Sequence, residues 1–379
     1  MKKSLILLFF AVLIITMGGC SSNNDGKSPE ECGLLLGTEI DDWAKAAKQT
    51  SDGGFIIAGA KAMGNISGKM WVLKLDADKN IQWEKTFSQE GRIESATDII
   101  ETPGGFIVCG YSQHAETGNM DMRIMKLDLA GGQVWSEDFG AQADEAAFSI
   151  DKTGDGNYVV AGYANGEGKI KGDIWVLIID DDGELIRESI LERNELEIAS
   201  KIVATSDGGF IVSAGRINND DGTFNDLLIK LDENLAELWR GTYGDKNDSA
   251  NTVIEIPGGK YVVAGGKITL VDSMGKAEWQ KSYAGVIMGV RQTQDGGFII
   301  AEQSEFWGPG AMDILVLKLN PNGEKVWAKA FGGKQNDSPL SIEITNDGGY
   351  IVAGQTMSAG AGSRDLWVLR LDQKGECVW

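Results

Sequence analysis

The chain has very little of several residues on which common protein chemistries depend. Its 379 residues include one histidine, six prolines and four cysteines. A catalytic triad that needs histidine would have to be built around the single His114. Basic residues are also scarce, 35 against 56 acidic residues, which gives a formal charge of −21. A surface this acidic repels phosphate backbones and anionic lipid headgroups, so we expect no nucleic-acid partner.

The only long apolar run lies at the N-terminus, in an arrangement typical of an export signal. Two lysines precede the run Leu5–Ile15, which is short for a membrane span, and two glycines stand directly before Cys20. This order resembles a bacterial lipoprotein signal, although Met17 stands where leucine is usual. The resemblance implies a signal peptide over residues 1–19 and a lipid, palmitate included, on Cys20.

The alternatives for this segment are an ordinary cleaved signal or an uncleaved anchor. Residues 20–31 are polar and aperiodic, so we expect a flexible tether. No second apolar span follows, which predicts a soluble body held at the bacterial cell envelope. Its membrane contact would be the Cys20 lipid only, in the outer membrane if the host is Gram-negative.

Self-similarity is the strongest pattern in the sequence. A tight turn followed by an aromatic residue recurs seven times. The seven anchor residues are Phe55, Phe106, Tyr158, Phe210, Tyr261, Phe298 and Tyr350. Their successive intervals are 51, 52, 52, 51, 37 and 52 residues. Seven anchors predict seven structural units, and the short interval after Tyr261 predicts that the fifth unit lacks a loop.

Each unit is predicted to contain four short strands. A turn such as Asp52-Gly-Gly separates the first two strands, because glycine tolerates the backbone angles of a tight turn. The second strand is an apolar run, and a longer polar loop leads to a third strand such as Trp71–Asp76. These features predict an all-β, seven-bladed β-propeller of four-stranded antiparallel blades. A parallel β-helix is the rival architecture, but its coils are usually shorter.

The fourth strand carries a tryptophan in six units and Ile186 in the third. We expect these tryptophans to pack between blades. Trp83 precedes its anchor by 23 residues, and the same count from the first anchor ends at Cys32. Residues 33–37 are therefore expected to complete the last blade and close the ring. Closure brings Cys32 near Cys377, so a disulfide between them is predicted if the register allows it.

The hairpin Leu75–Trp83 resembles the repeats of propeller lipoproteins and of pyrroloquinoline-quinone-type propellers. With the Asp-Gly-Gly-Phe turns, it makes residues 32–379 similar to bacterial β-propeller-repeat lipoproteins. The resemblance covers the whole predicted propeller and implies its architecture. The quinone enzymes generally have eight blades and a quinone pocket with calcium, and this sequence has neither the eighth unit nor a matching ligand set. Fold alone does not decide function.

An acidic position recurs before the first strand of most units. It lies thirteen or twelve residues before the anchor, and its members are Asp42, Glu94, Glu145, Glu197, Asp248 and Asp337. These carboxylates could ring the mouth of the central channel and bind a hard cation or an amine. Alternatively, each caps its strand by accepting local backbone hydrogen bonds. We expect no cofactor, with calcium at this mouth as the alternative.

A second acidic position recurs directly before five third strands and is interpreted as structural. Its members are Asp121, Asp173, Asp226, Asp313 and Asp365. Residues that break the repeat are better candidates for ligand binding. Glu305, Phe306 and Trp307 stand out in the loop of the sixth unit, and Phe224 in that of the fourth. Aromatic residues beside carboxylates suit peptides or sugars; the alternative is that they cover a blade edge.

Together these patterns predict a monomeric binding or scaffolding module that presents its loop face to a protein, peptide or glycan. No catalytic set is evident in the sequence, so an enzyme is not the expected class. Two alternatives stay open. One is a carbohydrate-active hydrolase or lyase that uses paired carboxylates at the channel mouth. The other is a scaffold for outer-membrane assembly.

Overall fold

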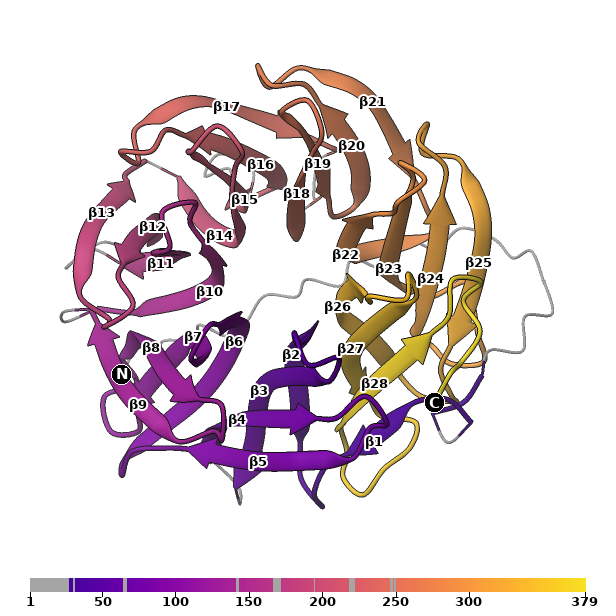
Figure 1. Cartoon of the computed structure of the whole chain (residues 1–379). Helices are drawn as coiled ribbons and strands as arrows, with labels where there is room; N and C mark the ends of the chain where they lie inside the picture. The colour runs from indigo at the N-terminus through magenta and orange to yellow at the C-terminus, as the bar shows by residue number, and fades with distance from the viewer. Residues whose placement is uncertain are drawn as a thin grey trace.

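The computed structural model describes residues 27–379 except residues 30, 64–66, 141–142, 166–171, 194, 218–221, 246–247 and 249. The described chain forms seven four-stranded antiparallel sheets arranged around a central axis (Figure 1). The predicted seven-bladed β-propeller is confirmed. The predicted signal peptide, Cys20 and most of the tether lie outside the described residues. Where the chain is described, no helix is long and apolar enough to cross a bilayer.

Six blades are each built from four consecutive strands. Blade 1 contains β2 (Asp42–Gln49), β3 (Phe55–Met63), β4 (Ser67–Leu75) and β5 (Ile81–Phe87). Blade 2 contains β6 (Arg92–Thr102), β7 (Gly105–His114), β8 (Met120–Asp128) and β9 (Gln133–Phe139). Blade 3 contains β10 (Glu145–Lys152), β11 (Tyr158–Asn165), β12 (Gly172–Ile179) and β13 (Leu185–Leu191). Blade 4 contains β14 (Leu196–Ala204), β15 (Phe210–Ile217), β16 (Phe224–Leu231) and β17 (Glu237–Tyr243).

The remaining blades include the shortest one and the one that closes the ring. Blade 5 contains β18 (Thr252–Ile256), β19 (Lys260–Ala264), β20 (Lys267–Val271) and β21 (Ala277–Ser282). Blade 6 contains β22 (Gly285–Gln292), β23 (Phe298–Ser304), β24 (Asp313–Leu319) and β25 (Lys325–Phe331). Blade 7 contains β26 (Asp337–Ile344), β27 (Tyr350–Thr356), β28 (Asp365–Leu371) and β1 (Leu34–Leu36). Only two residues join β19 to β20, which confirms the missing loop of the fifth unit.

The N-terminal strand closes the ring as predicted. β1 is the outermost strand of blade 7 and pairs antiparallel with β28, with Leu34 opposite Val368. A disulfide joins Cys32 to Cys377, whose Cα atoms lie 5.8 Å apart. The first and last segments of the propeller are therefore held together both by backbone pairing and by a covalent bond.

The repeated tryptophans connect each blade to the next. The Trp83 ring of β5 packs edge-on against Phe106 of blade 2, with ring centroids 5.9 Å apart. Equivalent pairs are Trp239–Tyr261, Trp279–Phe298, Trp327–Tyr350 and Trp379–Phe55. A turn of blade 2 lies against the same indole, since a Cβ added to Gly131 would meet the Trp83 ring at 2.8 Å. These contacts explain the 23-residue spacing and confirm that the tryptophans pack between blades.

An ion pair within the blade holds the Asp-Gly-Gly turn. Lys74 of the third strand lies 2.8 Å from the Asp52 carboxylate, which also accepts the backbone N–H of Gly54. Burial raises the pKa of Asp52, but hydrogen bonds from Lys74 and Thr50 outweigh it and lower the value to about 2. The same pair recurs as Lys230–Asp207, Lys318–Asp295 and Arg370–Asp347. The turn aspartate is therefore structural.

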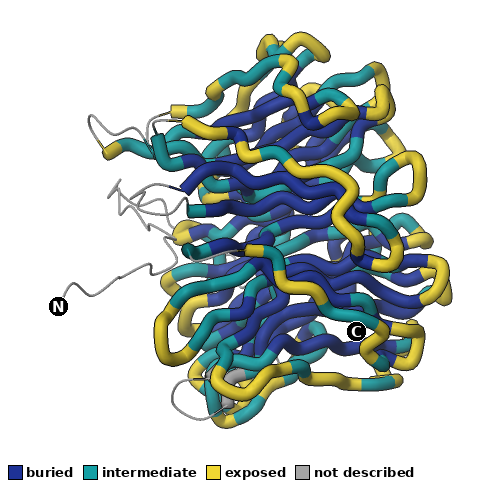
Figure 2. The backbone as a smooth tube through the Cα atoms, turned by 90° about the vertical axis from the view of Figure 1, so that its left-hand side faces the viewer, coloured by how far each residue is buried: buried dark blue, intermediate teal, exposed yellow. Residues whose placement is uncertain are grey.

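The hydrophobic core lies between the blades rather than in the centre of the ring. Buried residues follow the inner three strands of each sheet, whereas exposed residues gather at the turns and the outer strands (Figure 2). The third strands β24 and β28 are buried throughout, and the outer strand β13 is mostly exposed. This packing leaves the innermost strands free to carry polar side chains toward the axis.

Candidate functional site

A β-bulge in the innermost strand of six blades determines which side chains reach the axis. In blade 1 the pairing of β2 with β3 skips Lys45, between Ala44 and Ala46. The equivalent skipped residues are Thr97, Phe148, Ser200, Met288 and Leu340. A bulge bends the strand and redirects the side chain of the extra residue. All six of these residues line a cavity at the centre of the ring.

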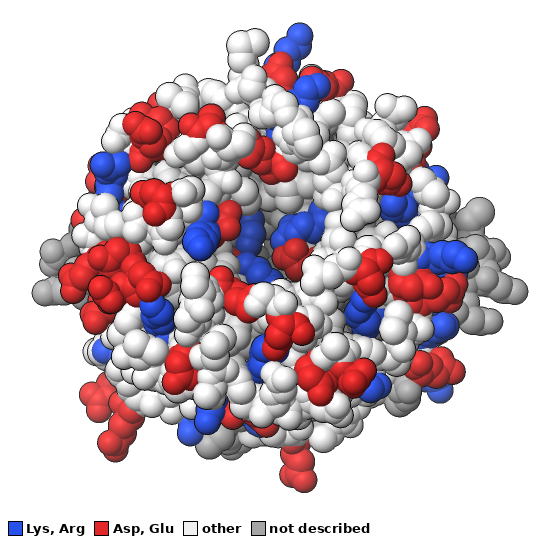
Figure 3. All heavy atoms as spheres, in the orientation of Figure 1, with Lys and Arg blue, Asp and Glu red and all other residues white. Residues whose placement is uncertain are grey.

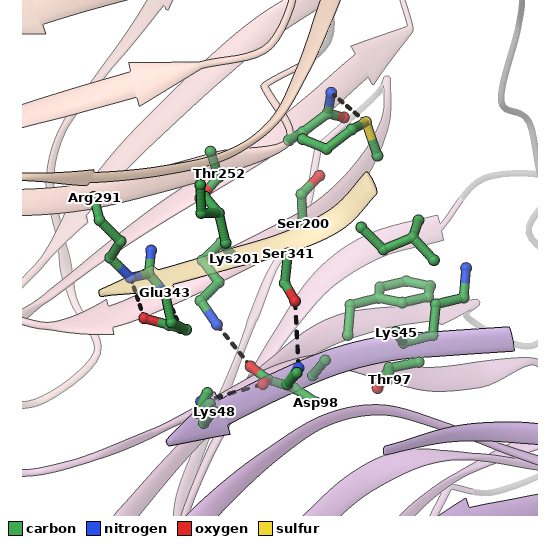
Figure 4. Close-up of a pocket in the computed structure, with 18 residues that line it drawn as sticks. Lys45, Lys48, Thr97, Asp98, Ser200, Lys201, Thr252, Arg291, Ser341 and Glu343 are labelled. Carbon is green, nitrogen blue, oxygen red and sulfur yellow. Dashed lines mark hydrogen bonds and ion pairs between the residues drawn. The ribbon is translucent and has the colours of Figure 1, made fainter. Parts of the chain in front are cut away.

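The central cavity receives residues from the innermost strands of all seven blades or from their immediate ends (Figure 4). Its volume is about 120 Å³. A space of this size holds several water molecules. It therefore suits a small polar group, such as a carboxylate or a phosphate, better than a whole sugar or cofactor.

The lining of this cavity is basic although the chain is acidic. Its charged members are Lys45, Lys48, Lys201, Arg291, Asp98 and Glu343. Four cations against two anions give a formal lining charge of +2, whereas the chain carries −21. Figure 3 shows several basic side chains gathered inside the central opening of one face, beside a few acidic ones. A charged opening of this kind concentrates ligands of the opposite sign.

Two lysines share one carboxylate in this channel (Figure 4). The Nζ atom of Lys201 lies 2.7 Å from Oδ2 of Asp98, and that of Lys48 lies 3.2 Å from Oδ1. Burial acts to raise the pKa of Asp98, but the charges of Lys201 and Lys48 outweigh it and hold the pKa well below its usual range. The group therefore stays ionised, and the cluster keeps one surplus positive charge.

Of the other charged groups that line the cavity, Lys45 adds to this surplus, whereas Arg291 and Glu343 balance each other. The Arg291 guanidinium donates hydrogen bonds to both carboxylate oxygens of Glu343, so this pair is neutral overall. Burial, together with the nearby Arg364, lowers the pKa of Lys45 to about 8. Lys45 is therefore still largely protonated at neutral pH.

The predicted acidic series lies at the junctions between blades, and none of its six residues lines the central cavity. Asp42 accepts hydrogen bonds from the backbone N–H of Thr38 at 2.5 Å and from its hydroxyl at 2.8 Å. Asp337 accepts the backbone N–H of Gly333 and the hydroxyl of Ser358, both at 2.8 Å. Hydrogen bonds from nearby backbone N–H and hydroxyl groups are the contacts expected if these carboxylates cap their strands.

Other members of the series take charged or backbone partners. Glu94 forms an ion pair with Arg123, and Glu197 forms one with Arg240 at 2.8 Å. Burial raises the pKa of each glutamate, and its arginine opposes the shift. Asp248 accepts the backbone N–H of Asp245, and Glu145 is buried at the start of β10.

The second acidic position brings a further carboxylate to most junctions. Burial raises the pKa of Asp226 to about 8 and that of Asp313 to about 7. The nearby carboxylates of Asp248 and Asp337, respectively, add to these shifts. Like charges that are held together in a buried site favour protonation of one partner. The junctions therefore contain carboxyl groups that are not simply solvated surface charges.

Glu302 is a buried carboxyl group that the repeat does not predict. It is fully buried in β23, opposite Ile287, where the other blades place glycine or alanine. Neither carboxyl oxygen has a hydrogen-bond partner among the described residues. Burial raises its pKa to about 8, and an interaction with the backbone N–H of Gly285 only partly opposes this shift. Glu302 lies on the face of β23 that packs against the short blade 5.

The loop residues predicted to bind a ligand differ in exposure. Phe306 is 56% exposed and Glu305 is also exposed, so both can reach a partner. Trp307 instead packs against the core shared by blades 5 and 6, with Lys325 Nζ 5.3 Å from its ring centroid. Phe224 is half-buried as the first residue of β16. The contacts of Trp307 are those of a side chain that covers a blade, which was the alternative interpretation.

Sequence analysis did not identify the channel residues Lys48, Asp98, Lys201 and Arg291. One signal could have found them, since each places a charge on the first strand of its unit, seven to nine residues before the anchor aromatic. The varying offset conceals the pattern until the bulges are placed. Over the described part of the chain, no group of three or more histidine, cysteine or acidic side chains gathers into a candidate metal site.

Comparisons with known proteins agree on the fold. No protein-family model matches the chain. A curated relative, the regulatory protein FlaEY of Caulobacter vibrioides, is 26% identical over 180 residues, which is 43% of this chain. The match spans only 17% of that relative's length.

Solved structures similar to this chain are also propeller proteins. Puromycin hydrolase matches with a TM-score of 0.56 and 12% identity, over 89% of this chain and 53% of its own. BBS1N in complex with ARL6DN matches with a TM-score of 0.53 and 10% identity, over 89% and 97%. Sqt1 from Chaetomium thermophilum matches with a TM-score of 0.51 and 13% identity, over 91% and 87%. At these identities the likeness shows the propeller fold alone.

Proposed function

We propose that this chain is a binding module that recognises an acidic segment of a protein partner, one carboxylate of which enters the central channel. The observation that carries the proposal is the basic lining of the channel in a chain of net charge −21. Lys48 and Lys201 share the single carboxylate of Asp98, so a second carboxylate would complete the pairing. Charge-assisted hydrogen bonds of this kind are about twice as strong as neutral ones.

The loop-bearing end of blade 6 would supply the surrounding contact surface. Phe306 is 56% exposed and Val286, near the start of β22, is 47% exposed. Exposed apolar groups beside a charged opening are typical of a protein interface, in which an apolar centre has a polar rim. BBS1N, which has a similar fold, was solved in complex with ARL6DN, so this architecture accommodates protein partners. That likeness supports the class of function only by analogy of fold.

As part of the same proposal, the chain is exported and held at the bacterial cell envelope by a lipid on Cys20. The order of two lysines, an apolar run, two glycines and Cys20 supports this location. The Cys32–Cys377 disulfide supports it independently, because disulfides persist in compartments outside the reducing cytosol. The envelope would be the outer membrane in a Gram-negative host.

Replacing Lys48 by methionine is expected to weaken binding of a hexaglutamate peptide by about tenfold, equivalent to about 1.4 kcal/mol, because one of two converging cations is lost. The reverse change, Asp98→Asn, is expected to strengthen binding, because it releases both lysines for the ligand. Titration of the fluorescently labelled peptide, followed by anisotropy at low salt, measures both effects.

The matched control is Lys329→Met, which removes an equal charge from the outer strand β25. An equal loss of affinity in this control would mean that binding follows total charge, and the channel proposal would be abandoned. A parallel titration with an oligogalacturonate distinguishes the class of partner. Tighter binding of the sugar acid than of the peptide would replace the protein partner with an acidic glycan.

A further inference from the structure

The protein neutralises the carboxylates at several blade junctions with its own basic side chains. Arg123 pairs with Glu94 within blade 2, and Arg240 pairs with Glu197 within blade 4, each at the start of the blade's first strand. Arg92 lies 2.6 Å from Asp121, where blades 2 and 3 meet. Between blades 4 and 5, Lys267 lies 2.7 Å from Asp245 and only partly opposes the burial that raises the pKa of Asp226 and of Asp248. At these junctions a basic side chain of the protein itself balances the charge of the carboxylates.

The junction between blades 6 and 7 has the carboxylates without such a cation. Asp313 at the start of β24 is 1% exposed, and Asp337 at the start of β26 is fully buried. Among the described residues, no lysine, arginine or histidine forms an ion pair with either group. Two buried carboxylates without a counter-ion are costly, because burial of unpaired charge is strongly unfavourable.

Each of these carboxylates is fixed by one oxygen and leaves the other unused. Asp313 Oδ2 accepts the backbone N–H of Gly310 at 3.0 Å. Asp337 Oδ2 accepts the backbone N–H of Gly333 and the hydroxyl of Ser358, both at 2.8 Å. The Oδ1 atoms of both residues are buried and have no hydrogen-bond partner. Buried polar atoms are rarely left unsatisfied in native proteins, so these two call for a ligand.

The two carboxylates converge over one glycine. A Cβ atom added to Gly332 would lie 1.8 Å from Oδ1 of Asp313 and 2.9 Å from Oδ2 of Asp337. Both groups therefore approach the same point of the backbone, where only glycine fits.

Backbone carbonyl groups join the same cluster of oxygen atoms. A Cβ atom added to Gly310 would lie 2.4 Å from the carbonyl oxygen of Gln335, 2.7 Å from that of Gly333 and 3.2 Å from Oδ1 of Asp313. Two carboxylates and two carbonyls thus gather where the loop before β24 meets the loop before β26. All four are hard oxygen donors, and none carries positive charge.

We propose that this junction binds one Ca²⁺ ion through the carboxylates of Asp313 and Asp337, with the carbonyl oxygens of Gly333 and Gln335 and water completing the coordination. Calcium takes six to eight oxygen ligands, including backbone carbonyls and waters, and tolerates irregular geometry. Two carboxylates balance its charge. The ion would balance the charge of the buried carboxylates between blades 6 and 7, as a basic side chain does at other junctions. This role is independent of the central channel.

Calcium titration of the full chain by isothermal calorimetry tests the proposal. We expect the wild-type chain to bind Ca²⁺ in about the 10⁻⁴–10⁻³ M range of extracellular modules and to melt at a higher temperature when it is bound. Asp313→Asn and Asp337→Asn are each expected to bind one ion fewer. Asp121→Asn is the matched control, because Asp121 occupies the same position of the repeat and already has Arg92 2.6 Å away, and this variant should bind as the wild type does.

Three results would overturn the calcium site. The first is the absence of binding heat for the wild-type chain up to about 10 mM Ca²⁺, well above that affinity range. The second is an unchanged number of ions in both Asp313→Asn and Asp337→Asn, and the third is an equal loss in Asp121→Asn. If one variant does not fold, the other decides the question, since both remove a direct ligand. A melting temperature of the wild-type chain that EDTA lowers and Ca²⁺ restores is the expected second readout.

Discussion

Replacing Cys32 and Cys377 by alanine is expected to lower the free energy of unfolding by about 6 kcal/mol, the size that loop-closure entropy assigns to so long a loop. The disulfide joins residues 345 positions apart, so it encloses nearly the whole propeller. Without it, the unfolded chain gains the freedom of two independent ends. The three-residue strand β1 would then be held to β28 by backbone pairing alone. Urea denaturation followed by tryptophan fluorescence measures the change.

Single and double variants show whether the bond, rather than the side chains, is responsible. Cys32→Ala, Cys377→Ala and the double variant should lose the same amount, because each breaks the same bond. Cys109→Ala is the control, since this buried thiol is free and its loss costs only about 1 kcal/mol of packing. A double variant within 1 kcal/mol of the wild type would show that the disulfide adds little to the closed ring.

The stability of the protein is expected to fall as the pH rises from about 5 to about 8 because of Glu302. Its folded-state pKa is about 8, against a usual value of 4.5, so the folded state keeps a proton that the unfolded state has lost. This contribution is fully present below pH 4.5 and is lost as the pH passes the folded value. The free energy of unfolding falls by up to about 1.4 kcal/mol per pH unit, and therefore by several kcal/mol between pH 5 and 8.

Glu302→Gln isolates this effect, because glutamine keeps the shape of the side chain and cannot ionise. The variant should be more stable than the wild type at pH 8 and should have a flatter profile between pH 5 and 8. Asp226 and Asp313 contribute slopes of the same sign, so the comparison is made between the two proteins at each pH. Glu305→Gln, an exposed neighbour in sequence, serves as the control. Parallel profiles for wild type and Glu302→Gln would show that Glu302 is ionised in the folded state.

The architecture was predictable because each blade repeats one set of packing contacts at one spacing. The 23 residues between Trp83 and Phe106 correspond to an indole that packs on the anchor of the next blade. The same count from Phe55 therefore located Cys32 at the closure. A repeat that is fixed by contact between neighbours can be read from a single sequence, because any change in spacing would break the contact.

The channel could not be predicted in the same way, because β-bulges determine which residues face it. Asp98, Lys201 and Arg291 stand eight, nine and seven residues before their anchors, so no fixed period connects them. A bulge depends on pairing between strands, which one strand's sequence does not encode. Glu302 was missed for a related reason. The repeat predicts a small residue there, and the short hairpin of blade 5 is the local difference beside it.

The pairing of β1 with β28 also sets the order in which the molecule can form. Blades 1 to 6 are each contiguous in sequence, so each can fold as soon as its own strands are made. Blade 7 needs Leu34 and Val368, which a ribosome working at about 5–20 residues per second makes tens of seconds apart. The first strand must wait unpaired through that interval. A chain that stops short of β28 would keep exposed strand edges, which can pair with other chains and cause aggregation. Synthesis of β28 is therefore the step that allows the ring to close and removes these edges.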